Sequence, residues 1–385
     1  MKKAGKTGLV VASLGLMSSL GAHAEGPSFY ALIDGGVASS SVSGSGKNLG
    51  SSKTEFVTGG YAPTFAGMKY EKPIEGGLTV GAQLEQGFLL TPDNTGDRWA
   101  FGNGNILNRQ ANLYLKSSMG TVVVGTQPNI AFNTVLLGDP RFGSNYGSSL
   151  AMIDIAGKLN TVDDASISYT APTFSGLTLA GQIVSQSKTT AAPSGTGYGQ
   201  GPSGSGINHG ARASATYTYE KFTGGLAYYS SAIPGTINSD ATKSISASTN
   251  SGTILALTYK LEPVTLKFIG ADQKVSYDNS PSSSYKVKTW GLGAVYAMGS
   301  KTTFDAGYYE SNFDGTDTKT TTYAAGVQYK LTSNISAYGQ LAKVDSKGSA
   351  SFVPWNFTWY TVQGVGMAAG QSASTANIGL LFSFF

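Results

Sequence analysis

Apolar and polar residues alternate with a period of two along most of this chain. From Leu177 to Val184, leucine and isoleucine side chains alternate with small or polar ones. Residues 211–218 and 322–329 repeat the pattern, with alanine, valine and tyrosine on the apolar face. Successive side chains of an extended strand point to opposite faces, so each segment predicts a β-strand with one apolar face and one small or polar face.

The alternation predicts sixteen strands of about 8 to 12 residues each, with no domain boundary between them. They start near Phe29, Phe65, Leu78, Asn108, Thr121, Ala165, Leu177, Gly210, Thr223, Thr253, Val264, Ser284, Thr302, Thr320, Ile335 and Ala373.

Short turns alternate with long connectors between these strands. The long connectors are rich in Gly, Ser, Thr and Asn and span residues 39–54, 187–208, 232–251, 278–283, 314–319 and 346–372. A closed antiparallel barrel produces this asymmetry, and a barrel of sixteen strands encloses water rather than a packed core. The predicted fold is therefore all-β: a transmembrane antiparallel β-barrel with short periplasmic turns and long extracellular loops.

A tyrosine recurs immediately before the short turns. It occupies the same place in six of them, as Tyr70, Tyr169, Tyr219, Tyr259, Tyr296 and Tyr329. An amphipathic ring where each strand leaves hydrocarbon predicts an interfacial aromatic girdle. Cross-strand packing in a soluble sandwich explains a single such tyrosine but not the repeated placement.

Composition narrows the class of protein. Only 12% of the residues are charged and there is no cysteine, against about 25% charged in an average soluble protein. Beyond residue 24 no apolar run reaches the about 18 residues of a transmembrane helix, which excludes a helical membrane bundle. Without cysteine there are neither disulfides nor thiolate metal sites, and we expect no metal and no cofactor.

The first residues predict a secretory signal peptide over residues 1–24. Lys2, Lys3 and Lys6 precede an apolar stretch of about a dozen residues, and a small-x-small site ends at Ala24,. Cleavage before Glu25 leaves residues 25–385 as the barrel. Loss of three lysines lowers the formal charge from +4 to +1, so the sequence gives no support for binding nucleic acid.

Several short motifs carry a family resemblance: Gly76–Phe88, Asn108–Gln127 and Tyr169–Gln182. They resemble the sixteen-stranded general porins of Gram-negative outer membranes, most of all the β-proteobacterial type. The resemblance implies a channel for passive diffusion of small hydrophilic solutes and ions. Two positions depart from the family pattern, because Phe65 and Thr126 stand where such porins usually carry arginine.

The resemblance also implies that residues 127–164 form the third loop, folded into the lumen as a constriction. Carboxylates on this loop facing basic residues on the wall would set a transverse field across the pore. Alternation supports an inward position for Arg212 and Lys267, whereas only family likeness places Arg109 in the pore. With few arginines we expect weak ion selectivity and a preference for small neutral or zwitterionic solutes. The candidate pore-lining residues are Lys69, Arg109, Asp139, Arg141, Asp154, Lys158, Asp163, Asp164, Arg212 and Lys267.

Family likeness further implies partners. A homotrimer would use the chain ends and small residues of the first strand, such as Gly35, Gly36 and Ala38. Phe385 would serve as the C-terminal signal for the barrel-assembly machinery, although the apolar alternation of Ile378 to Phe384 leaves it on the opposite face. Outer-membrane lipid and lipopolysaccharide complete the expected partners.

We expect no enzymatic activity, whereas a sugar channel and an adhesin or structural barrel remain as alternatives. An outer-membrane enzyme would need a base, but His209 lies in a Gly/Ser-rich stretch without a nucleophile motif, and adjacent Asp163 and Asp164 point to opposite faces of a strand,. An adhesin or structural barrel is a further alternative. A sugar channel would need an aromatic track, for which the candidates are Phe132, Phe142, Tyr146, Trp99 and Trp290.

Overall fold

The computed structural model describes residues 26–44, 52–90, 106–149, 153, 159, 161–185, 209–233, 236–237, 244–245, 248–277, 284–348 and 370–384. The predicted signal peptide lies outside these residues. So do the cleavage pair Ala24 and Glu25, the loop charges Asp154 and Lys158, and Trp99 and Phe385. No helix within the described ranges is long and apolar enough to cross a membrane.

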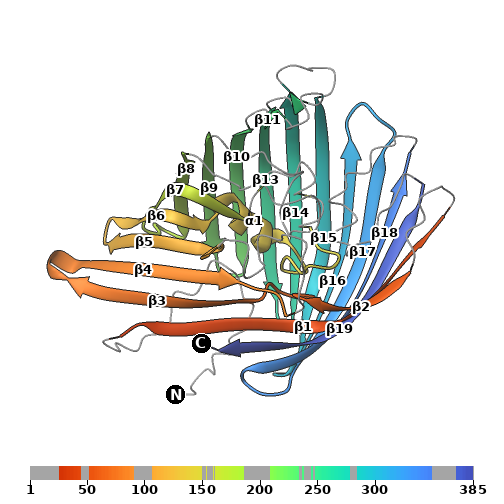
Figure 1. Cartoon of the computed structure of the whole chain (residues 1–385), viewed down its shortest axis with the longest axis horizontal. Coiled ribbons are helices and arrows are strands. Elements are labelled where there is room, and N and C mark those ends of the chain that lie inside the picture. Colours follow the sequence, from red (N-terminus) through yellow and green to blue (C-terminus); the bar gives the residue numbers. More distant parts are fainter. Residues whose placement is uncertain are drawn as a thin grey trace.

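Strands make up nearly all of the described chain (Figure 1). They are β1 (Ser28–Ser43), β2 (Lys53–Thr58), β3 (Phe65–Ile74), β4 (Leu78–Gly87), β5 (Gln110–Ser117), β6 (Gly120–Pro128), β7 (Val162–Thr170), β8 (Leu177–Val184), β9 (His209–Tyr219), β10 (Phe222–Ile233), β13 (Ser248–Leu261), β14 (Val264–Tyr277), β15 (Tyr285–Met298), β16 (Thr302–Phe313), β17 (Lys319–Lys330), β18 (Ile335–Lys347) and β19 (Ser372–Phe384). β11 (Thr236–Ile237) and β12 (Ser244–Ile245) form a separate two-stranded sheet. Two short helices complete the description, α1 (Ile130–Gly138) and a single turn at Glu75–Gly77.

The main sheet closes on itself. Each strand pairs antiparallel with its neighbours, and β1 pairs with β19 from Ala31 opposite Phe384 to Ser43 opposite Ser372. The sheet has seventeen strands, but β2 and β3 both pair with the same side of β1. They are two halves of one barrel strand, so the ring has sixteen positions, which confirms the predicted barrel.

The sequence-based prediction missed β2. Residues 39–54 were expected to form a loop because serine and glycine dominate them, yet β1 continues to Ser43 and β2 begins at Lys53. Pairing within the barrel holds these residues in strands: Ala38 pairs with Glu55, and Ser40 pairs with Lys53 across the sheet. Pairing thus extends β1 through a serine-rich segment of low strand preference, whereas β2 itself carries the strand-favouring residues Thr54, Phe56, Val57 and Thr58,.

Side chains alternate between the outer and inner faces as predicted. On β8, Leu179 and Ile183 are 50% and 63% exposed on the outside, whereas Gln182 and Val184 are buried on the inside. All six turn tyrosines are exposed on the outer face. A second outer row of rings contains Trp290, Tyr308 and Tyr323, whose neighbouring centroids are 5.2 Å apart.

The two aromatic rows bracket an apolar band. On β15, Trp290 and Tyr296 are six positions apart with Leu292 and Ala294 between them on the same face. At about 3.4 Å per residue this separation is roughly 20 Å along the strand. An outward band of about 25 Å flanked by aromatic girdles is the signature of an outer-membrane barrel.

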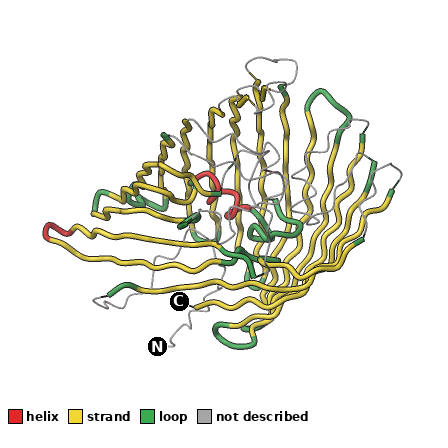
Figure 2. Tube along the Cα trace, viewed as in Figure 1, coloured by secondary structure: helices red, strands yellow, loops and turns green. Residues whose placement is uncertain are grey.

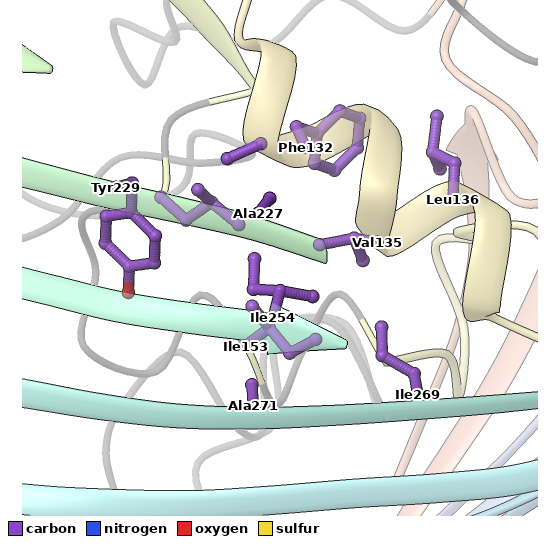
Figure 3. Close-up of a cluster of buried hydrophobic side chains, with 11 residues drawn as sticks. Phe132, Val135, Leu136, Ile153, Ala227, Tyr229, Ile254, Ile269 and Ala271 are labelled. Carbon is purple, nitrogen blue, oxygen red and sulfur yellow. The ribbon is translucent and has the colours of Figure 1, made fainter. Parts of the chain in front are cut away.

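Helix α1 is part of the segment that connects β6 to β7, and it lies inside the barrel (Figure 2). Asn129 caps it, since its side chain accepts a hydrogen bond of 2.9 Å from the Ala131 amide,. The helix ends at Gly138, with Asp139 as its C-cap and Pro140 directly after it,. Its side chains Phe132, Val135 and Leu136 pack on inward-facing residues of the wall (Figure 3), namely Ala227, Tyr229, Ile254, Ile269 and Ala271.

Candidate functional site

The segment between β6 and β7 runs along the inner wall of the barrel. α1 contacts β8, β9, β10, β13 and β14. The residues after it continue round the wall: an added Cβ at Gly293 of β15 would contact Pro140, and one at Gly147 would contact Ala324 of β17 and Ala342 of β18. The described part of the loop thus lines the inner face from β8 to β18.

The root of the loop is held by a buried ion pair. Arg212 of β9 donates a hydrogen bond of 3.1 Å from Nη2 to Oδ1 of Asp163 at the start of β7, and both side chains are buried. Beside them Gln182 accepts a hydrogen bond of 3.0 Å from the Ile130 amide at the start of α1. An irregularity in the pairing of β6 with β7, between Gly125 and Gln127, places Asp163 opposite Gln127.

The end of α1 is organised around Asp139. Its carboxylate accepts hydrogen bonds from the backbone amides of Arg141 at 3.0 Å and Gly143 at 2.8 Å. The hydroxyl of Tyr309 on β16 donates a further bond of 2.6 Å. Lys267 of β14 donates to the backbone carbonyls of Leu136 at 3.2 Å and Asp139 at 3.1 Å. The lysine therefore compensates the carbonyl end of the helix dipole.

Arg141 continues this attachment toward β16 and β18. Its Nη1 lies 3.4 Å from Oδ1 of Asp305, and neither side chain is exposed to solvent by more than a few per cent. Its Nη2 donates hydrogen bonds of 2.5 Å to Gln340 and 3.3 Å to Ser144. The charge of Arg141 is thus neutralised within the loop–wall interface.

These contacts change the arrangement expected from the sequence. Arg212 and Lys267 do face inward, but the loop groups Asp139 and Asp163 lie against them instead of across an open gap. The reason is the path of the loop, which packs α1 directly onto the strands that carry the basic residues. Arg212 thus pairs with the Asp163 carboxylate, as a buried charge requires, whereas Lys267 binds backbone carbonyls at the end of α1,. Asp164 is half-buried beside Asp163 at the start of β7.

The wall formed by β3, β4 and β5 carries a polar cluster of its own. Glu85 of β4 is buried and accepts bonds from Arg109 at 2.5 Å, Tyr30 at 2.9 Å and Gln110 at 3.1 Å. The Arg109 guanidinium lies 4.4 Å from the centre of the Phe65 ring. The aromatic ring at position 65, where the resemblance predicts arginine, thus contacts an arginine that directly precedes β5.

A second cluster lies nearer the short turns of the same wall. Glu71 of β3 accepts hydrogen bonds from Lys116 at 2.5 Å and Tyr114 at 2.8 Å, and Lys69 lies 2.9 Å away. Lys69, Glu71 and Lys116 are partly exposed, unlike the pairs beneath the loop. Lys69 is the one predicted wall cation that retains access to water.

The aromatic residues considered for a sugar track lie in separate places. Phe132 belongs to α1 and is buried between that helix and the wall, and Tyr146 is buried beside Ala38 and Val57. Lys267 stands 4.0 Å above the Phe142 ring, and Trp290 faces outward next to Tyr308. The four candidate aromatic residues that the structure describes therefore form no continuous line along the interior. His209, the base considered for an enzyme, is the exposed first residue of β9.

Several residues of this site were missed by the sequence analysis. Glu71, Glu85, Lys116 and Asp305 all occupy inward positions of their strands. Alternation would have nominated them, because each directly follows an outward-facing apolar residue, namely Tyr70, Leu84, Leu115 and Phe304,. Tyr309 carried a similar signal, one position away from the outward Tyr308.

Closure of sixteen strand positions around an internal loop, with aromatic girdles outside, defines an outer-membrane channel barrel. The sequence profile described as Gram-negative porin matches residues 9–349. The chain belongs to this family, and it forms a channel for passive diffusion across the outer membrane. The sequence matches none of the curated proteins compared with it.

Solved structures share the fold at low sequence identity. An anion-selective porin from Comamonas acidovorans aligns with a TM-score of 0.73 and 17% identity, over 93% of this chain and 99% of the other. The outer-membrane protein OmpT of Vibrio cholerae aligns with a TM-score of 0.63 and 13% identity, over 93% and 97%. OmpF of Salmonella typhi, in complex with daunomycin, has a TM-score of 0.56 and 14% identity, over 93% and 97%. Similar structures include a trimeric form of OmpT.

Proposed function

We propose that this porin is a general diffusion pathway of weak ion selectivity, narrowed between the loop of residues 127–164 and the wall of β3, β4 and β5. The observation that carries the proposal is the position of α1, which is buried against inward-facing side chains of β10, β13 and β14. Polypeptide packed there reduces the cross-section available to water. Solutes then pass between the loop and the polar side chains of the remaining wall.

Weak selectivity follows from pairing of the charges. Arg109 is bonded to Glu85, Arg141 lies against Asp305, and Arg212 against Asp163. A paired charge presents a dipole rather than a net field to a passing ion, and salt screens what remains beyond about 8 Å. Small neutral or zwitterionic solutes are the expected cargo. The Comamonas porin, described as anion-selective, provides the contrasting case.

Single-channel recording in a planar bilayer under a salt gradient tests this proposal. Large conductance steps with a reversal potential near zero are expected. A strong reversal potential of the anion-selective sign would contradict weak selectivity. A correctly folded barrel that gives no steps would contradict the open passage and favour an adhesin or structural role.

We propose a homotrimer that associates through the outer face of β1, β2 and β19. Phe56 and Ile378 are 76% and 68% exposed there, around a shallow apolar groove that includes Gly35 and Leu90. Glycine lets another backbone approach closely in the membrane, where small residues favour packing. Conductance steps that occur in threes, and a cross-linked species of three chains, are the expected results. Phe56→Ala should weaken the oligomer and leave the channel of each barrel open.

Beyond the aromatic row of Trp290, Tyr308 and Tyr323, on the side away from the short turns, the outer face suits a phosphate-bearing lipid. We propose lipopolysaccharide as its occupant. Lys286 pairs directly with Lys274 on outward-facing positions, and Lys347 lies opposite Lys319, which is itself paired with Glu310 at 2.6 Å. Like charges directly opposite each other destabilise a sheet, and a lipid phosphate bound between Lys274 and Lys286 would offset this repulsion. Lipopolysaccharide vesicles should raise the thermal midpoint, and Lys274→Gln with Lys286→Gln should remove part of that gain. Lys72→Gln, at the other rim, is the matched control.

We also propose that the barrel-assembly machinery recognises β19 during insertion. Ile378, Leu380 and Phe384 face outward on β19, the strand that closes the barrel against β1. A strand presented with one apolar face and a terminal aromatic residue is a suitable recognition element. Deletion of Phe385 should slow assembly in vivo while leaving detergent refolding unchanged.

A further inference from the structure

The second strand of the barrel, which consists of β2 and β3, is interrupted between these two segments. Leu32 of β1 pairs with Phe65 of β3, and Gly35 of β1 pairs with Thr58 of β2. Three steps along β1 therefore correspond to seven along its partner, four more than a regular ladder allows. Residues 59–64, which we call the strand break, leave the wall at this point. Their contacts are with inward-facing side chains, so the strand break enters the lumen.

Asp34 holds the strand break. It is fully buried on the inner face of β1, and its Oδ2 accepts hydrogen bonds from the amides of Tyr61 at 2.6 Å and Ala62 at 2.7 Å. Its Oδ1 accepts a bond of 2.6 Å from the hydroxyl of Tyr338 on β18. Thr64 adds a bond of 2.9 Å from the Asp34 amide to its own hydroxyl oxygen. One carboxylate thus satisfies two backbone amides that the interrupted ladder leaves without strand partners.

The strand break in turn holds the far part of the loop. The side-chain amide of Asn145 in the loop donates to the carbonyl of Gly59. Gln340 of β18 donates a bond of 2.6 Å to the carbonyl of Gly60 and accepts bonds from Arg141 at 2.5 Å and Ser144 at 2.7 Å. Gln340 therefore connects the strand break and the loop directly.

The loop is consequently fixed along its described length: at its root, through the wall contacts of α1, Asp139 and Arg141, and in its far part. Its root is fixed by Asp163 and Arg212, and its far part by the strand break. Without the strand break the residues around Asn145 would be held less tightly, and loop motion on the microsecond scale or slower is detected in ionic current as fluctuation.

We propose that the strand break is a second inward element of the channel, and that Asp34 is a positioning residue which fixes the far part of the loop through it. The inference rests on the proposed function, in which this loop bounds the passage. Removal of the carboxylate leaves the amides of Tyr61 and Ala62 buried without acceptors. The strand break then relaxes, and Asn145 and Gln340 lose their shared attachment.

The test compares Asp34→Ala, Asp34→Asn and Gln340→Ala in planar bilayers, with vesicle swelling in neutral sugars of increasing size. We expect Asp34→Ala to give a noisy open state with sublevels and a larger size limit. Asp34→Asn keeps one acceptor oxygen and should lie between it and the wild type. Asp34→Ala combined with Gln340→Ala should equal the stronger single variant, because both act on one attachment.

Glu85→Gln is the matched control, because Glu85 is also a buried inward carboxylate with several donors but is bonded to the β3–β5 wall. It should shift the reversal potential and leave the noise unchanged. A single thiol gives a second readout, since the chain has no cysteine. Ser148→Cys, on a residue only 1% exposed, should react with a water-soluble maleimide at least about tenfold faster when Asp34 is also replaced.

Heat-modifiable migration and circular dichroism establish that each variant is folded. If Asp34→Ala does not fold, Asn145→Ala removes the same link from the loop side without touching the carboxylate. A folded Asp34→Ala or Asn145→Ala with quiet current, unchanged size limit and slow labelling would overturn the inference. A wild-type barrel that does not conduct, or one in which detachment of α1 by Val135→Asp leaves the current unchanged, would instead overturn the proposed function.

Discussion

Arg212 and Asp163 meet 3.1 Å apart beneath the root of the inward loop, with both side chains removed from water. The arginine belongs to β9 and the aspartate to the start of β7, two positions away in the ring. The pair therefore fastens the point where the loop rejoins the wall. Its energetic weight differs from that of an exposed pair, because each charge without the other would remain buried and uncompensated.

We predict that Arg212→Ala and Asp163→Asn each lower the free energy of unfolding by about 3 to 5 kcal/mol. The double variant should lose much less than the sum, since neither charge is then left alone. Urea unfolding in lipid vesicles, analysed as a double-mutant cycle, measures the coupling. Lys288 and Asp314, 3.9 Å apart and more than half exposed, form the control pair, with an expected coupling of about 0 to 1 kcal/mol. Equal coupling in both pairs would contradict the assignment.

The packing of α1 gives a second prediction. Val135 is fully buried against the wall, so Val135→Ala should cost about 1 to 2 kcal/mol of stability and raise current noise slightly,. Val135→Asp should detach the helix and produce a larger, unsteady conductance. Val124→Ala, on an outward side chain that is 51% exposed, is the size-matched control and should leave the current unchanged. Identical recordings from the two alanine variants would show that α1 does not bound the passage.

The sequence predicts the barrel because strand alternation is local. Each strand carries its own inward and outward faces, and a tyrosine marks where it meets the turn, so neither requires knowledge of the partner strand. β2 was missed because it is only six residues long and follows a Ser/Gly-rich stretch, although Thr54, Phe56 and Val57 favour a strand,. α1 was missed too, although Asn129 and the sequence Gly138-Asp139-Pro140 are ordinary signals for the start and end of a helix,.

The site was predicted less completely for a related reason. Charged residues were nominated one by one, but their partners are set by closure of the barrel. Arg212 and Asp163 are 49 positions apart, and Tyr338 reaches Asp34 across 304 positions. No local pattern encodes such contacts. Family likeness suggested charges facing each other across water, whereas the loop carries several of them into contact with the wall.

The outer aromatic rows predict the depth of the barrel in a bilayer. Trp290 lies in the row away from the short turns, 37% exposed and 5.2 Å from the Tyr308 ring. A variant that keeps Trp290 as its single tryptophan should be quenched most by lipids brominated near the glycerol and least by lipids brominated near the chain end. Leu292→Trp in a tryptophan-free background, two positions deeper on the same face, is the comparison. Stronger deep than shallow quenching of Trp290 would refute the placement of this row at the interface.

The cluster around Glu71 predicts how charge selectivity is balanced. Its carboxylate lies 2.9 Å from Lys69 and 2.5 Å from Lys116, and all three side chains are partly exposed. Glu71→Gln leaves two lysines without a counter-charge on the open wall, so the reversal potential under a salt gradient should move toward anions. Lys116→Gln should move it toward cations, and the double variant should return near the wild type. The shifts should shrink in molar salt, where the screening length falls to about 3 Å. Reversal potentials that do not change in any of the three variants would place this cluster outside the ion path.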